Sequence, residues 1–146
     1  NNRLIGNSAN NVLNGRGGND RIIGRGGNDS LIGGTGKDTI TGGPGADVFI
    51  YRSASDSEVG GARRDVITDF DGATGDRIDL SAIDAYDQLP GNQEFIYIAA
   101  DPFSGKQGEV RFESGILQAN TGSDTNADME ILLRGVTSLD PGHLIL

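Results

Sequence analysis

Hydrophobic residues recur at every ninth position through the first third of the chain. They are Leu4, Leu13, Ile22, Leu31, Ile40 and Phe49, and each stands at the centre of a triplet that follows a run of mostly small and polar residues. Because successive side chains of a strand point to opposite faces, such a triplet predicts a very short strand whose central residue faces inward. The six residues before each triplet are then predicted to form a turn.

The turns repeat as regularly as the apolar residues. From Gly6 the chain divides into the nonapeptides GNSANNVLN, GRGGNDRII, GRGGNDSLI, GGTGKDTIT and GGPGADVFI, and the same frame extends back to Asn2. Two nonapeptides make one coil of a flattened right-handed roll, so repeats two apart stack at the strand spacing of about 4.8 Å. The sequence therefore predicts an all-β fold in which residues 1–50 form a parallel β-roll.

Four of the turns carry an aspartate two positions before the inward-facing residue. Stacking of alternate repeats places Asp20 beside Asp38, and Asp29 beside Asp47. Two carboxylates at that spacing repel by roughly 1 kcal/mol in water and by more in a medium of lower dielectric constant. A cation between them removes this cost. A solvated glycine-rich linker, the alternative interpretation, has no reason to place an apolar residue after each of four aspartates.

Calcium is the cation that fits this set of ligands best. Carboxylates and the carbonyls of glycine-rich turns are hard oxygen ligands, which calcium prefers. Zinc requires Cys or His, and the chain has no cysteine and only His143. Magnesium retains more of its waters and demands a tighter octahedron. We therefore expect calcium ions as the cofactor of the roll.

The early repeats depart from the consensus and are expected to hold calcium weakly. Asn2 and Asn11 replace aspartate and bring no charge, so the combinations Asn2 with Asp20 and Asn11 with Asp29 are expected to be weak sites. The predicted strong sites are Asp20 with Asp38 and Asp29 with Asp47. Arginine replaces glycine at the second position of two turns, where a positive φ would cost about 1 kcal/mol.

Two aspartates beyond the repeats are further candidate ligands. Asp56 continues the nine-residue spacing and could complete a site with Asp38, unless its segment is an ordinary polar loop. Asp69 belongs to a cluster of aspartates around a glycine-containing turn, where turn capping is the alternative role. The full set of predicted ligands, side-chain or main-chain oxygens, is Asn11, Gly15, Arg16, Gly17, Gly18, Asp20, Gly24, Arg25, Gly26, Gly27, Asp29, Gly33, Gly34, Thr35, Gly36, Asp38, Gly43, Gly45, Asp47, Asp56 and Asp69.

Residues 51–146 lose the glycine period and alternate instead between short apolar runs and turns. Strands are predicted around residues 66–70, 78–80, 94–100, 109–114, 115–120 and 129–136. An open roll exposes a sheet edge and an apolar end, so we interpret this region as a β-strand cap that covers them. Its predicted core aromatic residues are Phe49, Phe70, Phe95, Tyr97 and Phe112. The apolar tail Leu144–Leu146 is expected to dock as a last strand, to be recognised by another protein, or both.

The amino-acid composition makes several classes of binding partner unfavourable. The chain has 146 residues, a net charge of −9 and no cysteine. The negative charge makes nucleic acid and anionic membranes poor partners. No stretch approaches the ~18 apolar residues of a membrane span, so membrane insertion is not expected. A small domain without disulfides commonly relies on a metal for stability.

The sequence offers no catalytic constellation. A zinc peptidase motif HExxH needs two histidines, and the chain has one. No serine lies in the G-x-S-x-G context of a hydrolase nucleophile. We therefore expect no enzymatic activity within this chain. A carbohydrate-binding or adhesion module is the second hypothesis, because Arg3, Arg16, Arg21 and Arg25 all fall on the predicted roll.

The repeat matches G-G-x-G-x-D-x-U-x, the calcium-binding pattern of RTX proteins. Together with GGPGADVFIYRSASDS, RRDVITDF, GDRIDLSAID and DPFSGKQGEVRF, it resembles the C-terminal RTX domain of serralysin-type metallopeptidases. Related modules follow secreted lipases and alginate epimerases. In the tail, Gly142 and His143 stand where such domains usually carry an acidic residue.

The resemblance implies a parallel β-roll closed by antiparallel strands, with calcium held by Asp20, Asp29, Asp38, Asp47 and the carbonyls of their turns. It also implies an attached N-terminal catalytic or effector domain. The location it implies is extracellular, in a Gram-negative bacterial setting, after export by a type I secretion apparatus that recognises the C-terminal tail. The chain would fold only when it meets calcium outside the cell, so it would stay unfolded during export.

Overall fold

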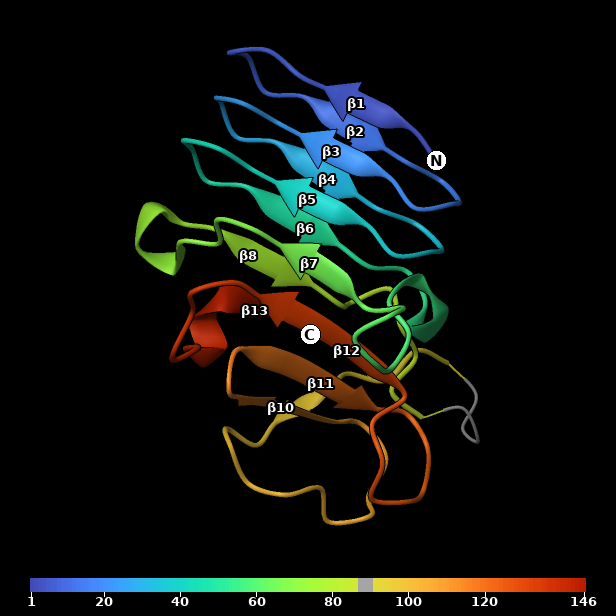
Figure 1. Ribbon diagram of the computed structural model, residues 1–146. Coiled ribbons are helices and arrows are strands. Elements are labelled where there is room, and N and C mark those ends of the chain that lie inside the picture. The colour runs from blue at the N-terminus through green and yellow to red at the C-terminus, as the bar shows by residue number, and fades with distance from the viewer. Residues whose placement is uncertain (87–90) are drawn as a thin grey trace.

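The computed structural model describes residues 1–86 and 91–146, and its regular elements are almost all short strands joined by turns (Figure 1). The first eight strands are β1 Arg3–Ile5, β2 Val12–Asn14, β3 Arg21–Ile23, β4 Ser30–Ile32, β5 Thr39–Thr41, β6 Val48–Ile50, β7 Asp65–Ile67 and β8 Arg77–Asp79. The remaining strands are β9 Ile96–Tyr97, β10 Glu109–Glu113, β11 Ile116–Asn120, β12 Met129–Leu133 and β13 Leu144–Ile145. Three 3₁₀ helices are η1 Ala54–Asp56, η2 Gly72–Thr74 and η3 Pro141–His143.

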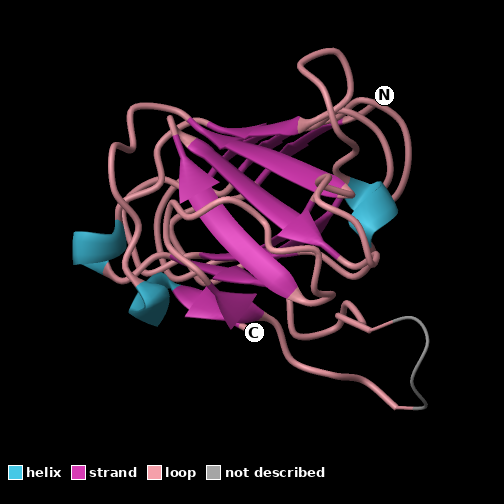
Figure 2. Cartoon of the chain, turned by 90° about the horizontal axis from the view of Figure 1, so that it is seen from below, coloured by secondary structure: helices cyan, strands magenta, loops and turns pink. Residues whose placement is uncertain are grey.

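The nonapeptides form the predicted roll. All six of their triplets are strands, and alternate strands pair in parallel with no shift, so that Arg3 lies opposite Arg21 and Leu13 opposite Leu31. Among β1 to β8, odd-numbered strands lie in one sheet and even-numbered strands in the other. Figure 2, seen from below, shows the two layers with their turns at both edges. The expectation of an all-β parallel roll is confirmed.

The central residues of the triplets form the narrow core of the roll. Ile22, Leu31, Ile40 and Phe49 are at most 1% exposed. Leu4 and Leu13 pack against the same core but are only half-buried, because β1 and β2 end their sheets. Their flanking residues face outward, and Val12 is 75% exposed. Each coil therefore contributes only two inward-facing apolar side chains.

The sheets of the roll continue beyond the end of the sequence repeat at Ile50. Strand β7 pairs in parallel with β5, and β8 pairs in parallel with β6. The sequence analysis predicted both strands but described them only as neighbours around a turn, whereas they lie in opposite sheets. The predicted boundary at residue 50 marks the end of the nine-residue sequence repeat, whereas both sheets continue beyond it.

The cap extends one of the two sheets. Strands β10, β11 and β12 are antiparallel, and β12 then pairs in parallel with β7, which joins the cap to the roll. The cap core contains Phe95 and Phe112, whereas Tyr97 is only partly buried and donates its hydroxyl to the Leu139 carbonyl. The C-terminal tail docks as β13 beside β8, with Leu144 buried.

Candidate metal centre

The turn aspartates form two ladders, one along each edge of the roll. The Oδ1 atom of each aspartate accepts a hydrogen bond from the main-chain nitrogen of the residue one coil earlier. On one edge, Asn2 donates to Asp20 at 2.5 Å, Asp20 to Asp38 at 2.7 Å and Asp38 to Asp65 at 2.6 Å. The other edge runs from Asn11 to Asp29 at 2.7 Å, from Asp29 to Asp47 at 2.8 Å and from Asp47 to Asp76 at 2.9 Å. The predicted neighbours are therefore brought together.

The second carboxylate oxygen of the ladder is buried without a hydrogen-bond donor. Among the described residues, this applies to Oδ2 of Asp20, Asp29, Asp38, Asp47 and Asp65. Each of these aspartates is at most 4% exposed. A buried carboxylate oxygen that lacks a donor carries a desolvation cost. These five atoms are the part of the roll that its own hydrogen bonds leave unsatisfied.

The glycine that begins each repeat leaves room beside this free oxygen. A Cβ atom on Gly15 would lie 2.5 Å from Asp20 Oδ2 and 2.6 Å from the Gly33 carbonyl oxygen. The same atom on Gly24 would lie 2.2 Å from Asp29 Oδ2 and 2.6 Å from the oxygen of Gly42. A carboxylate oxygen and a carbonyl oxygen from the next coil therefore converge where a side chain would otherwise stand.

Burial raises the pKa of these carboxyl groups. Desolvation raises the pKa of Asp38 to about 6, and the Asp20 and Asp56 charges add to it, although the Asp20 N–H acts in the opposite direction. Desolvation likewise raises the pKa of Asp47 to about 6, with further contributions from Asp76, Asp29 and Asp69. The pKa of Asp65 rises to about 8 through burial and the Asp38 charge, although the Asp38 N–H and the Tyr51 hydroxyl act in the opposite direction. Near neutral pH the roll therefore holds negative charge at a cost that a cation would offset.

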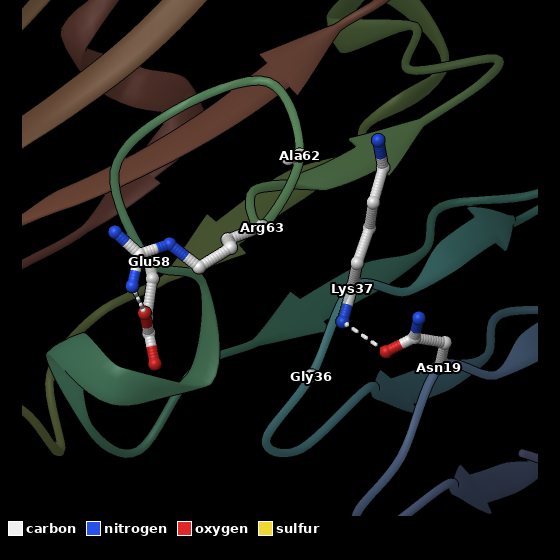
Figure 3. A pocket seen from close by; sticks show the side chains of 6 residues that line it. All are labelled: Asn19, Gly36, Lys37, Glu58, Ala62 and Arg63. Carbon is white, nitrogen blue, oxygen red and sulfur yellow. Dashed lines mark hydrogen bonds and ion pairs between the residues drawn. The ribbon is translucent and has the colours of Figure 1, made fainter.

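A second ladder, made by the residue before each aspartate, runs in the opposite direction. Asn1 Oδ1 accepts from the Asn19 nitrogen at 2.7 Å, and Asn19 Oδ1 accepts from the Lys37 nitrogen at 3.0 Å (Figure 3). The other edge repeats this with Asn10 and Asn28. Lys37, where the ladder stops, instead donates its ammonium group to the Gly61 carbonyl at 2.5 Å. The asparagines thus fix the spacing of the turns in which the aspartates lie.

The second position of the turn adopts a left-handed backbone in the second to fifth repeats. Arg16 and Arg25 have φ values of 72° and 81°, so the strain expected there is present. One coil later, a Cβ on Gly34 would lie 1.8 Å from the Arg16 oxygen, and one on Gly43 would lie 1.7 Å from the Arg25 oxygen. Glycine is therefore required where a turn stacks on the turn before it. The four arginines do not form one patch: Arg3 and Arg21 face outward from β1 and β3, while Arg16 and Arg25 lie in turns at opposite edges.

Asp65, not Asp56, takes the ladder position next to Asp38. Asp56 Oδ2 accepts hydrogen bonds from the Arg52 and Ser53 nitrogens, at 2.8 and 3.1 Å, and so caps η1. Its charge still reaches Asp38. Its role as a calcium ligand therefore stays a prediction, whereas the completion of the ladder falls to a residue that the sequence analysis did not select.

Asp69 lies beside the fifth repeat, where it caps a turn. Its two carboxylate oxygens accept from the Gly42 and Gly43 nitrogens at 3.0 and 2.9 Å.

Asn11 occupies the aspartate position of the first repeat. Its Oδ1 lies 2.2 Å from where a Cβ on Gly6 would stand, but it already accepts from the Asn7 nitrogen at 2.7 Å. The expectation of a weak site at Asn11 therefore remains a prediction that this geometry favours.

Ser57 carried no signal in the sequence, whereas Asp65, which continues the nine-residue spacing, and Asp76, in the aspartate cluster, were not selected as ligands. Asp65 lies 27 residues after Asp38 and Asp76 lies 29 after Asp47, instead of the 18 that separate ladder neighbours in the repeats. Ser57 ends the first ladder, because its hydroxyl accepts from the Asp65 nitrogen at 2.8 Å and donates to the Glu130 carbonyl. The serine thereby connects the ladder to the cap. A signal was available in the segments DVI and DRI, which repeat the pattern of an aspartate two positions before an inward-facing aliphatic residue.

The residues at the turns fit calcium better than other metals. Within residues 1–86 and 91–146, no group of three or more His, Cys, Asp or Glu side chains is placed to hold a metal ion. The available ligands are one free carboxylate oxygen for each turn together with main-chain carbonyls. A carbonyl that accepts one hydrogen bond retains a second lone pair, so the inter-turn bonds do not exhaust these oxygens. This mixture of carboxylate and carbonyl oxygens is typical of calcium sites.

Several other acidic residues have local structural roles. Asp71 caps η2, and Asp79 accepts from Ser81. In the loop before β12, Asp128 accepts from Thr121 and Gly122, and Asp124 accepts from Asn126. In the part of the chain that the structure describes, no helix is long and apolar enough to cross a membrane.

Comparison with known proteins matches almost the whole chain to one family. The model of the family described as peptidase M10 serralysin C terminal matches residues 5–141. No curated protein matches the sequence. The AlgE6R2 subunit of the Azotobacter vinelandii mannuronan C5-epimerase has a similar solution structure, with a TM-score of 0.60 and 26% identity over 98% of this chain and 91% of that chain. The AlgE6R3 subunit of the same enzyme gives a TM-score of 0.55 and 26% identity, with 96% and 80% covered.

Proposed function

The chain belongs to the peptidase M10 serralysin C-terminal family, and from this premise we propose that it is a non-catalytic, calcium-binding RTX module of a secreted protein. Calcium would bind in the turns of the roll, with Asp20, Asp29, Asp38 and Asp47 as carboxylate ligands. Asp65, which continues one ladder, would extend the same sites into the coil next to the cap. Asp76 continues the other ladder, but its Oδ2 already accepts from the Asp71 nitrogen at 3.0 Å.

The observation that carries this proposal is the row of free Oδ2 atoms. Five buried carboxylates each keep one oxygen without a hydrogen-bond donor among the described residues. In the cap, by contrast, the buried Glu130 accepts from Gly60, Arg64 and Gln118. Glu130 thus has donors for both carboxylate oxygens, whereas each of the five aspartates has a donor for only one. The free oxygens are suited to bind cations.

Calcium would also control when the module folds. Without it, the charged ladders repel and the glycine-rich backbone retains its conformational entropy, so the chain stays unfolded and suitable for export by a type I apparatus. At roughly millimolar extracellular calcium, sites with Kd values near 10⁻⁴ M fill, and each adds about 1.4 kcal/mol to folding. The strongest sites lie next to the cap, so we expect the cap to fold first and the roll to follow towards β1.

A calcium titration followed by circular dichroism tests the proposal. We expect the β-sheet signal to increase with calcium, to be reversed by EGTA, and to respond weakly to magnesium at the same concentration. Isothermal titration calorimetry on the same samples would give the affinity. A chain that is fully folded in EGTA and unchanged by added calcium would contradict the proposal.

A further inference from the structure

A groove of about 570 Å³ lies on the outer face of the cap sheet, beyond the point where Ser57 ends one aspartate ladder at the Glu130 carbonyl. Its floor consists of Arg111, Gln118 and Glu130, one from each of the neighbouring strands β10, β11 and β12. These residues alternate with the core residues of their strands, so their side chains face away from the core. The volume is within the range of small-ligand sites in proteins.

The floor is a continuous hydrogen-bonded row. Arg111 Nε donates to Gln118 Oε1 at 2.8 Å, and Gln118 Nε2 donates to Glu130 Oε1 at 2.8 Å. Arg64 and the Gly60 nitrogen hold the other oxygen of Glu130 at 3.0 and 2.9 Å. The row therefore fixes three planar polar groups side by side. Such groups lose little conformational entropy when a ligand binds.

The charges of the floor are paired within the protein. Arg111 contacts Glu113 at 2.8 Å, and Arg64 contacts Glu130 at 3.0 Å. Neither sign is left in excess along the row, so the groove has no preference for an anionic or a cationic ligand. Hydrogen-bonding capacity does remain, because the Gln118 amide has a second N–H and its oxygen has a second lone pair.

The walls are partly apolar. Pro102 and Val59 are exposed at the groove, and Ala127 is half-buried there. The ring of Phe103 lies beneath the Arg111 guanidinium, with 5.2 Å from its Cζ atom to the ring centroid, which also holds that guanidinium in place. A ligand for this groove needs several hydroxyl groups for the floor and C–H surfaces for the walls.

We propose that this groove binds a neutral saccharide of a few hexose units. Uncharged sugars combine hydroxyl groups with apolar ring faces, and they carry no charge that would require an unpaired partner in the protein. An anionic polysaccharide would have to separate Arg111 from Glu113 or Arg64 from Glu130 before either arginine could bind it. The site is independent of the proposed calcium function, except that the cap must be folded.

The test titrates the calcium-loaded chain with cellohexaose and with mannohexaose, and compares both with hexamannuronate of the same length. Binding is measured by calorimetry and by shifts of the backbone amide signals in NMR spectra. We expect a neutral hexasaccharide to shift the signals of residues 111, 118 and 126–130. Hexamannuronate should bind at least about tenfold more weakly, since it brings unpaired charge to a neutral floor.

Two variants locate the binding site. Ala127→Trp fills the groove without removing a floor residue and should weaken binding of the neutral sugar by at least about tenfold. Ser138→Trp places the same side chain on an exposed loop elsewhere on the cap and should leave binding unchanged. Circular dichroism shows whether each variant is folded. If Ala127→Trp does not fold, Gln118→Leu gives a second test and should weaken binding about fivefold through loss of its hydrogen bonds.

Three results would overturn the proposal. The first is no binding of either neutral hexasaccharide by the folded, calcium-loaded chain at millimolar concentration. The second is binding that Ala127→Trp and Gln118→Leu leave unchanged, which would place the sugar elsewhere. The third is stronger binding of hexamannuronate, which would indicate an anion site. A failure of calcium-induced folding would be detected separately by circular dichroism, so it would not be confused with any of these.

Discussion

The roll and the cap bury acidic side chains in opposite ways. In the cap, burial alone would raise the pKa of Glu130, but donors from Gly60, Gln118 and Arg64 outweigh burial and lower it. In the roll, burial raises the pKa of Asp38 and Asp47 to about 6 despite one main-chain donor to each. The cap therefore stabilises its buried charge with its own groups, whereas the roll does not.

The cap also has a larger apolar core than each coil of the roll. The cap packs several aromatic and aliphatic side chains between antiparallel strands, including Phe95, Phe112, Leu117 and Ile131. Each coil of the roll adds only two apolar side chains to a narrow interior. Because so little apolar surface is buried for each coil, stability must come from the turns. The cap therefore stabilises its buried groups with its own contacts, whereas the roll leaves part of that stabilisation to a ligand.

The largest expected effect comes from a side chain placed where two turns stack. Gly34→Ala would put a Cβ 1.8 Å from the Arg16 oxygen at a position where φ is 86°. We expect a loss of at least about 3 kcal/mol in the free energy of unfolding with calcium present, measured by urea denaturation. Gly135→Ala is the control, since φ is 80° there and no atom lies within 4 Å of the added Cβ. It should cost only about 1 kcal/mol. Equal losses in the two variants would mean that turn stacking does not constrain the roll.

The next effect separates the two kinds of buried acid. Asp38→Asn should lower calcium affinity at least about tenfold by removing a charged ligand, as measured by calorimetry. Glu130→Gln should leave calcium affinity unchanged but cost about 2 kcal/mol of cap stability, because its amide would face the donors that now hold the carboxylate. If both variants lost calcium affinity equally, the distinction between roll and cap would be wrong.

The stability of the calcium-free chain should fall as the pH rises from 5 to 8. Groups whose pKa is raised on folding stabilise the fold below their ordinary pKa, and this stabilisation is lost as the pH passes through the raised pKa. The raised values are about 6 for Asp38 and Asp47 and about 8 for Asp65. Glu130 has a lowered pKa, so its contribution is lost only in more acidic solution.

Circular dichroism in EGTA at pH 5 and pH 8 measures this effect as the ratio of folded to unfolded chain. This ratio should be more than about fivefold lower at pH 8, which corresponds to about 1 kcal/mol. Saturating calcium should reduce or reverse the difference, because it binds the ionised carboxylates. A calcium-free chain that becomes more stable towards pH 8 would show that the buried ladder carboxylates do not govern folding.

The smallest effect is expected in the loop before β12. Asp124 is exposed, and the Asn126 N–H and side-chain amide lower its pKa. Asp124→Ala should change the melting temperature of the calcium-loaded chain by less than about 1 °C and leave calcium affinity unaltered. A clear loss of calcium affinity in this variant would indicate a calcium site in the cap.

The sequence predicted the repeat part of the fold almost completely, because one local rule repeats there. A triplet with one apolar residue after a six-residue turn has few ways to pack, so the strands, their faces and the Asp20–Asp38 neighbours all followed from spacing. The rule failed after Ile50, where residues 51–64 intervene before the next strand. Asp56 and Asp65 both continue the nine-residue spacing, and the tertiary path of residues 51–64 decides that Asp65 joins the ladder.

Two further features could not be predicted, for a similar reason. Whether an aspartate oxygen is free depends on which donors surround it, and those donors come from the neighbouring coil and not from adjacent residues. The cap groove depends on β10, β11 and β12 meeting in one register, which places Arg111 opposite Gln118 and Gln118 opposite Glu130. In the cap, the sequence indicated where the strands lie but did not indicate their register.

A crystal structure of the calcium-loaded chain, with anomalous diffraction data that identify calcium, tests the central claim most directly. The account predicts calcium in the turns of the roll, bound by Oδ2 of Asp20, Asp29, Asp38 and Asp47 together with main-chain carbonyls of the stacked turns. It also predicts a weak signal or none beside Asn11. Anomalous signal confined to the cap, or turns that contain no calcium in crystals grown at millimolar calcium, would contradict it.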